Sequence, residues 1–548
     1  MVARATLAWF VAFHQAAQGN PTHVGEFLLQ ARVLVWKLVR FFDRHAEQAS
    51  IDVNRTVYAL SVTTPDFPDW AGGFADQLHK LRSAAGPTLH QFEILFGPWI
   101  PHGRLSQQDE GKHSRKRRWH LRLVFWTFLW QVAQAGAACR EAIRQAQATC
   151  KNAGQPAPPD EDSPYCQARG SLPLERLQEI HDCLCAEARE GVADKDLWCG
   201  HQVLALDGSA VTAPDTAANQ KAFPQQSVQK PGCGLPIIRL VALLSLATGM
   251  LTAWATGPWL SHEVGLFQSL WDCLRPDDVL LADRGFCNWG LLAQCLRRSI
   301  HAVFRVKGVR RADFRYGKRL SRNERLVQWR KTSCVPKTIP ASEWALLPEI
   351  LTLRLVRCRL DIPGFRTRQV ILVTTLLDSE KYPPEALSRL YFRRWAMELS
   401  LRNLKSTLQM DHLSCKNPEN LKREIRMHFL VHNLVRRLML EAARRYRVPL
   451  ERVSFAGGLA AARRYGEALL QARSRRQRQR LMEEMFGVMA ADLVPDRPGR
   501  REPRALKRRP KPYPLLMGHR RRWLEIPHKD KCPVRKARRS KRNSRDLN

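Results

Sequence analysis

Two aspartates stand where a folded core could present carboxylates for chemistry. Asp207 follows the apolar run 203–206, Asp283 follows the apolar run 279–282, and a glycine comes within two residues of each aspartate. The end of a buried strand is where an α/β sheet presents ligand groups at its edge. One such pair is a weak signal, because turns favour Asp-Gly for backbone reasons alone. Two of them together indicate a site.

A third carboxylate belongs to a segment that reads as a long helix over 384–408, with proline at its start where a helix tolerates it. At about 100° per residue, one sector of about 60° on this helix holds four polar side chains, those of Tyr391, Arg394, Glu398 and Lys405. The sector borders an apolar stripe that would pack on a sheet. The alternative is an ordinary amphipathic helix with an ion pair between Arg394 and Glu398, worth about 0.2 to 0.5 kcal/mol.

The spacing of these four residues, Tyr-(2)-Arg-(3)-Glu-(6)-Lys, resembles the signature of insertion sequence 4 family DDE transposases. Asp207 with the Gly-Ser after it, and Asp283 with Arg-Gly-Phe, resemble the two aspartate motifs of that family, although its first motif more commonly has threonine in place of the serine. The order and the gaps also fit, with 76 positions between the aspartates and 115 from Asp283 to Glu398. The likeness covers about residues 86–513 and does not cover 1–85.

The resemblance implies phosphodiester chemistry on DNA. Asp207, Asp283 and Glu398 are then the expected ligands of two Mg²⁺ ions, with Mn²⁺ as a substitute, because magnesium prefers hard oxygen ligands. The other three residues of the helix signature are expected to hold phosphates near the transposon end. The implied reaction is cleavage at the 3′ end with water, followed by strand transfer to target DNA in a cut-and-paste route.

The partners implied are double-stranded DNA, as terminal inverted repeats and as target, and a second copy of the chain in a homodimer on the DNA. No membrane partner is expected, and the expected location is the cytoplasm, with the protein on the nucleoid when it binds DNA. Two other functions stay open. One is a catalytically idle DNA-binding protein derived from a transposase, and the other is a nuclease of the same fold, which would cut without joining.

The composition agrees with an acidic partner. The 548 residues include 89 Lys and Arg against 51 Asp and Glu, a net charge of +38, while 44% hydrophobic residues exclude a disordered polyelectrolyte. The tail 501–548 holds 18 basic and 4 acidic residues. A second cationic run is expected to contact phosphates, unless it is only a solvated helix start, and consists of Lys112, Arg115, Lys116, Arg117 and Arg118. The 14 cysteines include no Cys-x-x-Cys pair, so their spacing excludes zinc-ribbon and thioredoxin-like sites, and a reducing compartment is the simplest explanation of these cysteines.

The periodicity predicts the elements that must position these residues. Their order, strand, hairpin, helix, strand, helix and strand, suits an α/β fold with a ribonuclease-H-like catalytic core, interrupted by a β-rich insertion and flanked by helical N- and C-terminal regions. The predicted divisions are an N-terminal extension of unknown role (1–85), a helical DNA-binding region (86–153), a linker and helix (154–200), the first part of the core (201–306), the insertion (307–368), the second part of the core (369–450), and a helical and basic C-terminal region (451–548).

Two weaker candidates have ordinary structural explanations. Asp272, Asp277 and Asp278 could form a carboxylate cluster, but a helix end and a turn before a strand explain them better. His428 and His432 have the i, i+4 spacing of metal ligands, yet the apolar residues between them favour a packed helix.

Overall fold

The computed structural model describes residues 91–100, 105, 118–307, 312–359, 369–495 and 517–518, all within one compact unit, Leu89–Asn548. Three parts of the chain singled out above lie outside the described residues: the extension 1–85, the cations Lys112, Arg115, Lys116 and Arg117, and nearly all of the tail 501–548. Among the residues that are described, no helix has the length and apolar character needed to cross a membrane.

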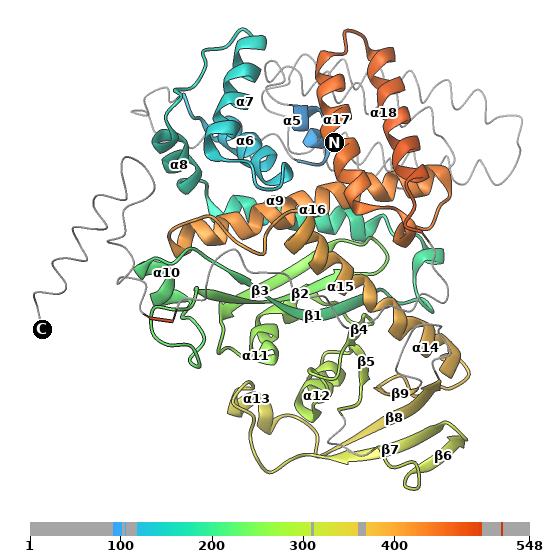
Figure 1. Cartoon of the computed structure of the whole chain (residues 1–548). Coiled ribbons are helices and arrows are strands. Elements are labelled where there is room, and N and C mark those ends of the chain that lie inside the picture. The colour runs from blue at the N-terminus through green and yellow to red at the C-terminus, as the bar shows by residue number, and fades with distance from the viewer. Residues whose placement is uncertain are drawn as a thin grey trace, which may run out of the picture. The chain divides into compact units, whose positions relative to one another are not determined.

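A nine-stranded mixed sheet forms the centre of this unit, in the order β3-β2-β1-β4-β5-β9-β8-β7-β6 (Figure 1). The strands are β1 (Val203–Thr212), β2 (Ile237–Ser245), β3 (Leu251–Pro258), β4 (Val279–Ala282), β5 (His301–Arg305), β6 (Lys318–Ser321), β7 (Glu324–Arg330), β8 (Ile350–Arg359) and β9 (Gln369–Thr374). β1, β4 and β5 are parallel to one another. The hairpin β2-β3 joins β1 antiparallel on one side, and β9 joins β5 antiparallel on the other.

Helices cover both faces of the sheet. On one face the helices that contact the strands are α9 (Leu174–Glu190), α14 (Pro384–Arg393), α15 (Trp395–Arg402) and α16 (Pro418–Tyr446). A further layer packs on α16 and consists of α6 (Leu121–Ala133), α8 (Asp162–Gly170), α10 (Ala217–Ala222), α17 (Phe455–Gln471) and α18 (Arg475–Ala491), with α5 (Gln91–Phe96) and α7 (Cys139–Asn152) packed on these helices. The other face packs on α11 (Glu263–Phe267), the 3-10 helix Gln268–Cys273, α12 (Trp289–Arg297) and α13 (Ala341–Ala345). Along β1, Val203 and Ala205 enter the first core while Leu204 and Leu206 enter the second, as the period of two requires.

β1 extends beyond its predicted end. The sequence predicts a strand that stops before Asp207, whereas β1 continues to Thr212 because β2 pairs with it as far as that residue. β4 pairs with β1 only up to Leu206, which lies opposite Ala282. Between Asp207 and Thr212, which bridges to His412, no strand of the described chain occupies this side of β1. The sheet therefore opens at Asp207.

The helix predicted over 384–408 is divided. α14 and α15 meet at Arg394, and a π-helical turn, Asn403–Thr407, follows α15. At the junction the Arg394 N–H donates to the Tyr391 carbonyl oxygen at 3.2 Å, and the Met397 N–H donates to the Arg394 carbonyl oxygen at 2.9 Å. Both bonds span three residues rather than four, so the chain tightens at Arg394.

The predicted β-rich insertion supplies β6, β7 and β8, which continue the same sheet through β9 (Figure 1). Its central contact is a buried ion pair. The Arg354 guanidinium on β8 is fully buried and donates from Nε to Glu324 Oε1 on β7 at 2.8 Å. The same guanidinium donates to the carbonyl oxygens of Asp378, at 3.1 Å, and Tyr382, at 2.8 Å. The pair thus connects the insertion to the loop that leads into α14.

Glu324→Gln is expected to lower the free energy of unfolding by about 3 to 5 kcal/mol, because it leaves the buried Arg354 charge without its partner. Denaturant unfolding followed by circular dichroism measures the difference. The matched control is Glu484→Gln, which breaks an exposed one-turn pair with Arg480 and should cost about 0.5 kcal/mol or less. Equal losses in the two variants would contradict the role given to the buried pair.

Candidate active site

The register of the parallel strands places three charged residues in one row. Leu206, Ala282 and Phe304 pair across β1, β4 and β5. The next residues along the three strands are Asp207, Asp283 and Arg305. Neighbouring strands lie about 4.8 Å apart, so these residues follow one another at the same end of the parallel strands. The two aspartates are therefore neighbours at the opening of the sheet.

Glu398 reaches this opening from above the sheet. Ala205 and Val211 enter the core formed with α14 to α18, and Asp207 lies at even spacing from both, so its side chain faces the same helices. α15, which carries Glu398, crosses β1 on that face (Figure 1). The structure thus brings together Asp207 within β1, Asp283 just after β4 and Glu398 on α15, and the charges of Asp283 and Glu398 both act on Asp207.

Arg394 lies between two of these carboxylates. Its Nη1 is 3.2 Å from Asp207 Oδ2, and its Nη2 donates to Glu398 Oε1. Only 15% of the Arg394 side chain is exposed, and its guanidinium lies 5.8 Å from the centroid of the Tyr391 ring. The one-turn ion pair considered above is present, and it also includes Asp207, so it is more than a surface pair.

The charges at the site perturb one another. Burial raises the pKa of Asp207 to about 6, opposed by the Gly208 N–H and the Arg394 charge and reinforced by repulsion from Asp283 and Glu398. Burial also raises the pKa of Tyr391, against the pull of Arg394 and Arg305. Burial by itself would lower the pKa of Arg394, but Glu398, Tyr391 and Asp207 together raise it, so the guanidinium stays charged.

The glycines next to the aspartates allow close approach. Asp283 Oδ1 accepts a hydrogen bond of 2.7 Å from the Gly285 N–H, and a β-carbon at Gly285 would lie 3.0 Å from that oxygen. Gly208 sits within β1, not in a turn, and a β-carbon there would lie 2.5 Å from Glu263 Oε1. Because side chains alternate along a strand, Glu263 lies on the opposite face of β1 from Asp207.

The remaining DNA-binding residues predicted from the sequence lie elsewhere or are only partly described. Lys405 is in the π-helical turn, where its Nζ lies 2.9 Å from Asp411 Oδ1. Lys405 therefore pairs with a different carboxylate from the two that Arg394 contacts, which are Asp207 and Glu398. Of the cationic run, the structure describes only Arg118, which is exposed.

The weaker candidates have the ordinary explanations favoured above. His428 and His432 are buried in α16, and burial lowers their pKa values to about 4 and 3. Asp278 is buried in an ion pair with Arg189, with Nη2 and Oδ1 2.6 Å apart. Asp277 is 82% exposed in the turn before β4.

Two further residues flank the carboxylates, and the sequence reasoning missed both. Arg305 is the last residue of β5 and lies beside Asp283. Its position at the end of an apolar run in the sequence could have identified it as a site residue. Trp395 follows Arg394 and is 51% exposed, an unusual exposure for a tryptophan. Its signal was a large aromatic side chain next to the polar sector of the helix.

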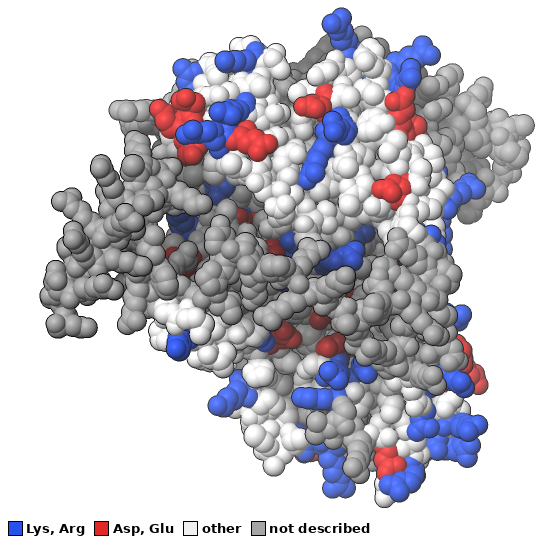
Figure 2. Space-filling model, in the orientation of Figure 1, with Lys and Arg blue, Asp and Glu red and all other residues white. Residues whose placement is uncertain are grey.

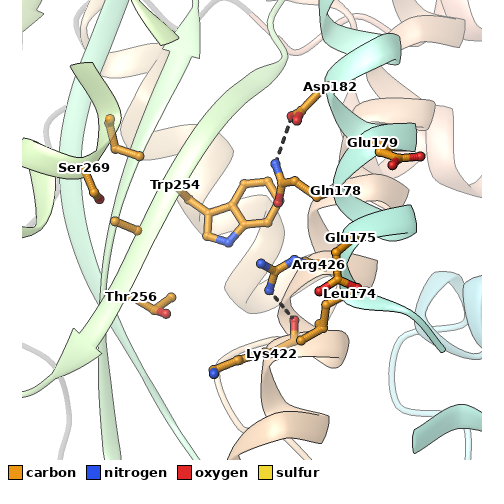
Figure 3. Close-up of a pocket in the computed structure, with 12 residues that line it drawn as sticks. Leu174, Glu175, Gln178, Glu179, Asp182, Trp254, Thr256, Ser269, Lys422 and Arg426 are labelled. Carbon is orange, nitrogen blue, oxygen red and sulfur yellow. Dashed lines mark hydrogen bonds between the residues drawn. The ribbon is translucent and has the colours of Figure 1, made fainter. Parts of the chain in front are cut away.

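A separate hollow of about 650 Å³ lies at the β3 edge of the sheet, between α9 and α16 (Figure 3). Trp254 of β3 faces Gln178 and Asp182 of α9 and Arg426 of α16 across it. Neither aspartate of the site nor Glu398 lines this hollow. The carboxylates therefore belong to a different surface of the protein.

Residues 198–434, which include all three carboxylates, match the family model described as the transposase DDE domain. The chain is similar to transposases. Over 404 residues, 73% of this chain and 88% of the relative, it is 26% identical to the transposase InsG for insertion sequence element IS4 of Escherichia coli (strain K12). Over 99 residues, 18% of this chain and 33% of the relative, it is 29% identical to the putative transposase InsZ of the same organism.

Among solved structures, one that aligns with this chain is the cryo-EM structure of the piggyBac transposase synaptic complex with hairpin DNA. The alignment has a TM-score of 0.34 and 8% sequence identity, and it covers 73% of this chain and 84% of that chain.

Arg394→Gln is expected to move the pKa of Asp207 above about 6, because the carboxylate loses its nearest cation. Asp207 holds its proton more tightly in the folded than in the unfolded chain, so the free energy of unfolding falls as pH rises through about 4 to 6. In the variant, the free energy of unfolding should continue to fall up to a higher pH than in the unchanged protein. The variant should be less stable by about 1 to 3 kcal/mol at pH 8, and by less below pH 6.

Denaturant unfolding at a series of pH values measures this shift. The matched control is Arg393→Gln, one residue earlier, whose exposed guanidinium donates to the Leu246 carbonyl oxygen at 3.3 Å. Its stability curve should keep the wild-type dependence on pH. If the two variants had the same curve, Arg394 would not be the counter-ion of Asp207.

Proposed function

We propose that this protein is a DNA transposase that cleaves the 3′ ends of an insertion sequence and transfers them to target DNA by a cut-and-paste route. The observation that carries the proposal is the meeting of Asp207, Asp283 and Glu398 at the opening of the sheet, inside the stretch that matches the transposase DDE domain. Similarity to the insertion-sequence transposase InsG over 73% of the chain supports it.

The strand arrangement supports a ribonuclease-H-like core in this role. β1, β2 and β3 form an antiparallel meander, and β4 and β5 add in parallel to its first strand. β6, β7 and β8 then come between β5 and α15, in the gap where the resemblance places a β-rich insertion. The insertion is proposed to extend the DNA-binding surface beside the carboxylates.

The three carboxylates form an all-oxygen donor set, which fits Mg²⁺, with Mn²⁺ as a substitute. Asp207, Asp283 and Glu398 would hold the ions. When bound, two such ions activate the attacking oxygen and stabilise negative charge on the leaving oxygen. Arg394 offsets the repulsion among the carboxylates, and so keeps them close enough to act as one ligand set.

The cations around the carboxylates are proposed to hold the DNA backbone. Arg394 is 15% exposed beside the carboxylates, and its charged guanidinium is proposed to contact a phosphate oxygen when DNA binds. Tyr391, Lys405 and Arg305 are proposed to contact neighbouring phosphates. Trp395, exposed beside them, suits stacking on an unpaired base near the cut.

A second cationic surface lies on the insertion. Figure 2 shows Lys and Arg side chains gathered at the end of the molecule where Figure 1 places β6 and β7. The exposed cations of this hairpin and its flanks are Arg315, Lys318, Arg319, Arg322 and Arg330. We propose that they contact DNA phosphates, together with the run at 112–118, and that two copies of the chain act on two transposon ends.

Conservative substitution of any one of the three carboxylates, as Asp207→Asn, Asp283→Asn or Glu398→Gln, is expected to lower the rate of DNA cleavage by at least about 10³-fold, because the ligand set is lost. The assay uses a duplex that carries the inverted repeats flanking the coding region, with Mg²⁺ or Mn²⁺. Mobility shifts should show unchanged DNA binding. Glu263→Gln, on the opposite face of β1, is the control and should cleave at the wild-type rate.

Other outcomes would support the two alternatives. Binding of the duplex without any cleavage by the unchanged protein would favour an idle DNA-binding protein. Cleavage without joining of the freed 3′ end to target DNA would favour a nuclease. Cleavage retained in Asp207→Asn would refute the assignment of the carboxylates.

Affinity for Mn²⁺ is expected to fall by about tenfold per pH unit below pH 6, because Asp207, with its pKa of about 6, must lose a proton to bind the ion. Electron paramagnetic resonance of free Mn²⁺ in a pH series from 8 to 5 measures this loss. Glu263→Gln should give the same curve as the unchanged protein. An affinity that is constant across this range would show that Asp207 does not bind the ion.

A further inference from the structure

A second set of metal-binding side chains lies at the opposite end of the same three parallel strands. His201 precedes β1, Asp277 precedes β4, and His301 is the first residue of β5. One potential ligand atom from each residue lies within 4.8 Å of the other two. We propose that these three residues bind a divalent transition-metal ion, with Zn²⁺ as the best fit. This site does not depend on the proposed function, since it shares no residue with the carboxylates.

The backbone around the cluster is held in uncommon conformations. His201 ends a tight turn in which Cys199 and Gly200 have φ values of 49° and 83°, and Trp198 and His201 exchange backbone hydrogen bonds of 2.9 Å. Asp277 has a φ of 71°, which is rare outside glycine, and its N–H donates to the Ser299 carbonyl oxygen at 2.8 Å. Such conformations concentrate at ligand-binding sites, where the surrounding structure maintains them.

The hydrogen bonds orient His201 as a ligand. Its Nδ1 lies 2.8 Å from the Asp277 carbonyl oxygen, which can only accept, so Nδ1 carries the proton. In the neutral ring, Nε2 then offers its lone pair, at present to the Tyr382 hydroxyl at 2.7 Å. An Nδ1–H bonded to a backbone carbonyl is a common support for an Nε2 metal ligand.

The second histidine completes the set with the aspartate. His301 Nε2 is 3.1 Å from Asp277 Oδ1, and the two imidazole ring centroids are 4.9 Å apart. Only 27% of the His301 side chain is exposed, and a metal ion would bind its neutral ring. Asp277 therefore contacts both histidines, one through its carbonyl oxygen and the other through its carboxylate.

The chemistry of the donors selects the ion. Two imidazole nitrogens and one carboxylate oxygen suit Zn²⁺ better than Mg²⁺, which prefers oxygen ligands and water. Tetrahedral ligands with bonds of about 2.0 to 2.1 Å lie about 3.3 Å apart, so the set must close by about 1.5 Å at most. The Asp277 side chain is 82% exposed, so solvent and not packed protein surrounds most of it. The Tyr382 hydroxyl or a water would be the fourth ligand.

An ion here would connect the start of the sheet to the helices that carry Glu398. Tyr382 lies two residues before α14, stacks on Trp198, and offers its carbonyl oxygen to the buried Arg354. Binding would therefore join the starts of β1, β4 and β5 to the loop before α14. We expect Zn²⁺ to raise the thermal midpoint of the protein without contributing to cleavage.

The test is a Zn²⁺ titration of the chelator-stripped, full-length protein against a chromogenic indicator. One ion per chain should bind, and both His301→Gln and Asp277→Asn should lose affinity by more than the about 10- to 100-fold typical of an outer-shell change. Co²⁺ should give visible bands of a tetrahedral site in the unchanged protein and lose them in both variants. Far-ultraviolet circular dichroism confirms that the variants are folded.

Two controls separate this site from other metal-binding groups. His412→Gln removes an exposed histidine that lies 3.9 Å from Asp411, and it should leave Zn²⁺ affinity unchanged. Asp207→Asn should also leave it unchanged, which distinguishes this site from the candidate active site. The proposal is overturned if no stoichiometric ion binds, or if His301→Gln and Asp277→Asn bind Zn²⁺ as tightly as the unchanged protein.

A third variant tests the charge around the site. The Lys381 ammonium lies close enough to Asp277 and His301 to influence both, and it opposes a bound cation. Lys381→Gln should therefore tighten Zn²⁺ binding by about two- to fivefold. Weaker binding in this variant would contradict the proposed position of the ion.

Discussion

The parallel pairing of β1 with β4, and of β4 with β5, determines where the charged groups of this protein meet. In parallel strands, the residues that follow the last paired positions lie next to one another at one end of the strands. The residues that precede the first paired positions lie next to one another at the other end. Asp207 and Asp283 meet at the first edge, and Asp277 and His301 meet at the second. A slip of one residue in this register would turn Asp207 to the opposite face, toward Glu263.

Electrostatics limits how the carboxylate edge can be built. Burial raises the pKa of Asp207, and repulsion from Asp283 and Glu398 adds to this effect. Arg394 offsets it by contacting Asp207 and Glu398 at once. The break between α14 and α15 occurs at this residue, so the backbone distortion and the charge compensation coincide. The same cation is the one proposed to contact a DNA phosphate, so one side chain serves both the stability of the site and the proposed binding of substrate.

Side-chain contacts connect the insertion to the segment that leads to this site. Arg354 on β8 holds both Glu324 on β7 and the loop around Tyr382. That loop leads directly into α14, whose continuation carries Glu398 over the sheet. The Tyr382 hydroxyl in the same segment contacts His201, so this segment touches the insertion, the start of β1 and the beginning of α14.

Local pattern predicted several of the elements and singled out three carboxylates that the fold brings near one another. The apolar run 279–282 is β4 with unchanged bounds, the predicted hairpin is β2-β3, and Asp207, Asp283 and Glu398 are brought together by the fold. Strand and helix periodicity depend on near neighbours in the chain, so the sequence alone determined them. The resemblance to a transposase signature rested on the same local spacings.

Only the tertiary structure decided the rest. β1 continues past Asp207 because β2 pairs with it there. The helix breaks at Arg394, the residue that contacts Asp207 on a strand almost 190 positions earlier. Lys405 pairs with Asp411, and the residues just after Asp411 return to the end of β1. The cluster of His201, Asp277 and His301 had no motif at all, since its members are far apart in the chain and meet only through strand register. Contacts between distant residues depend on which strands pair and where each pairing ends, and no local spacing encodes that.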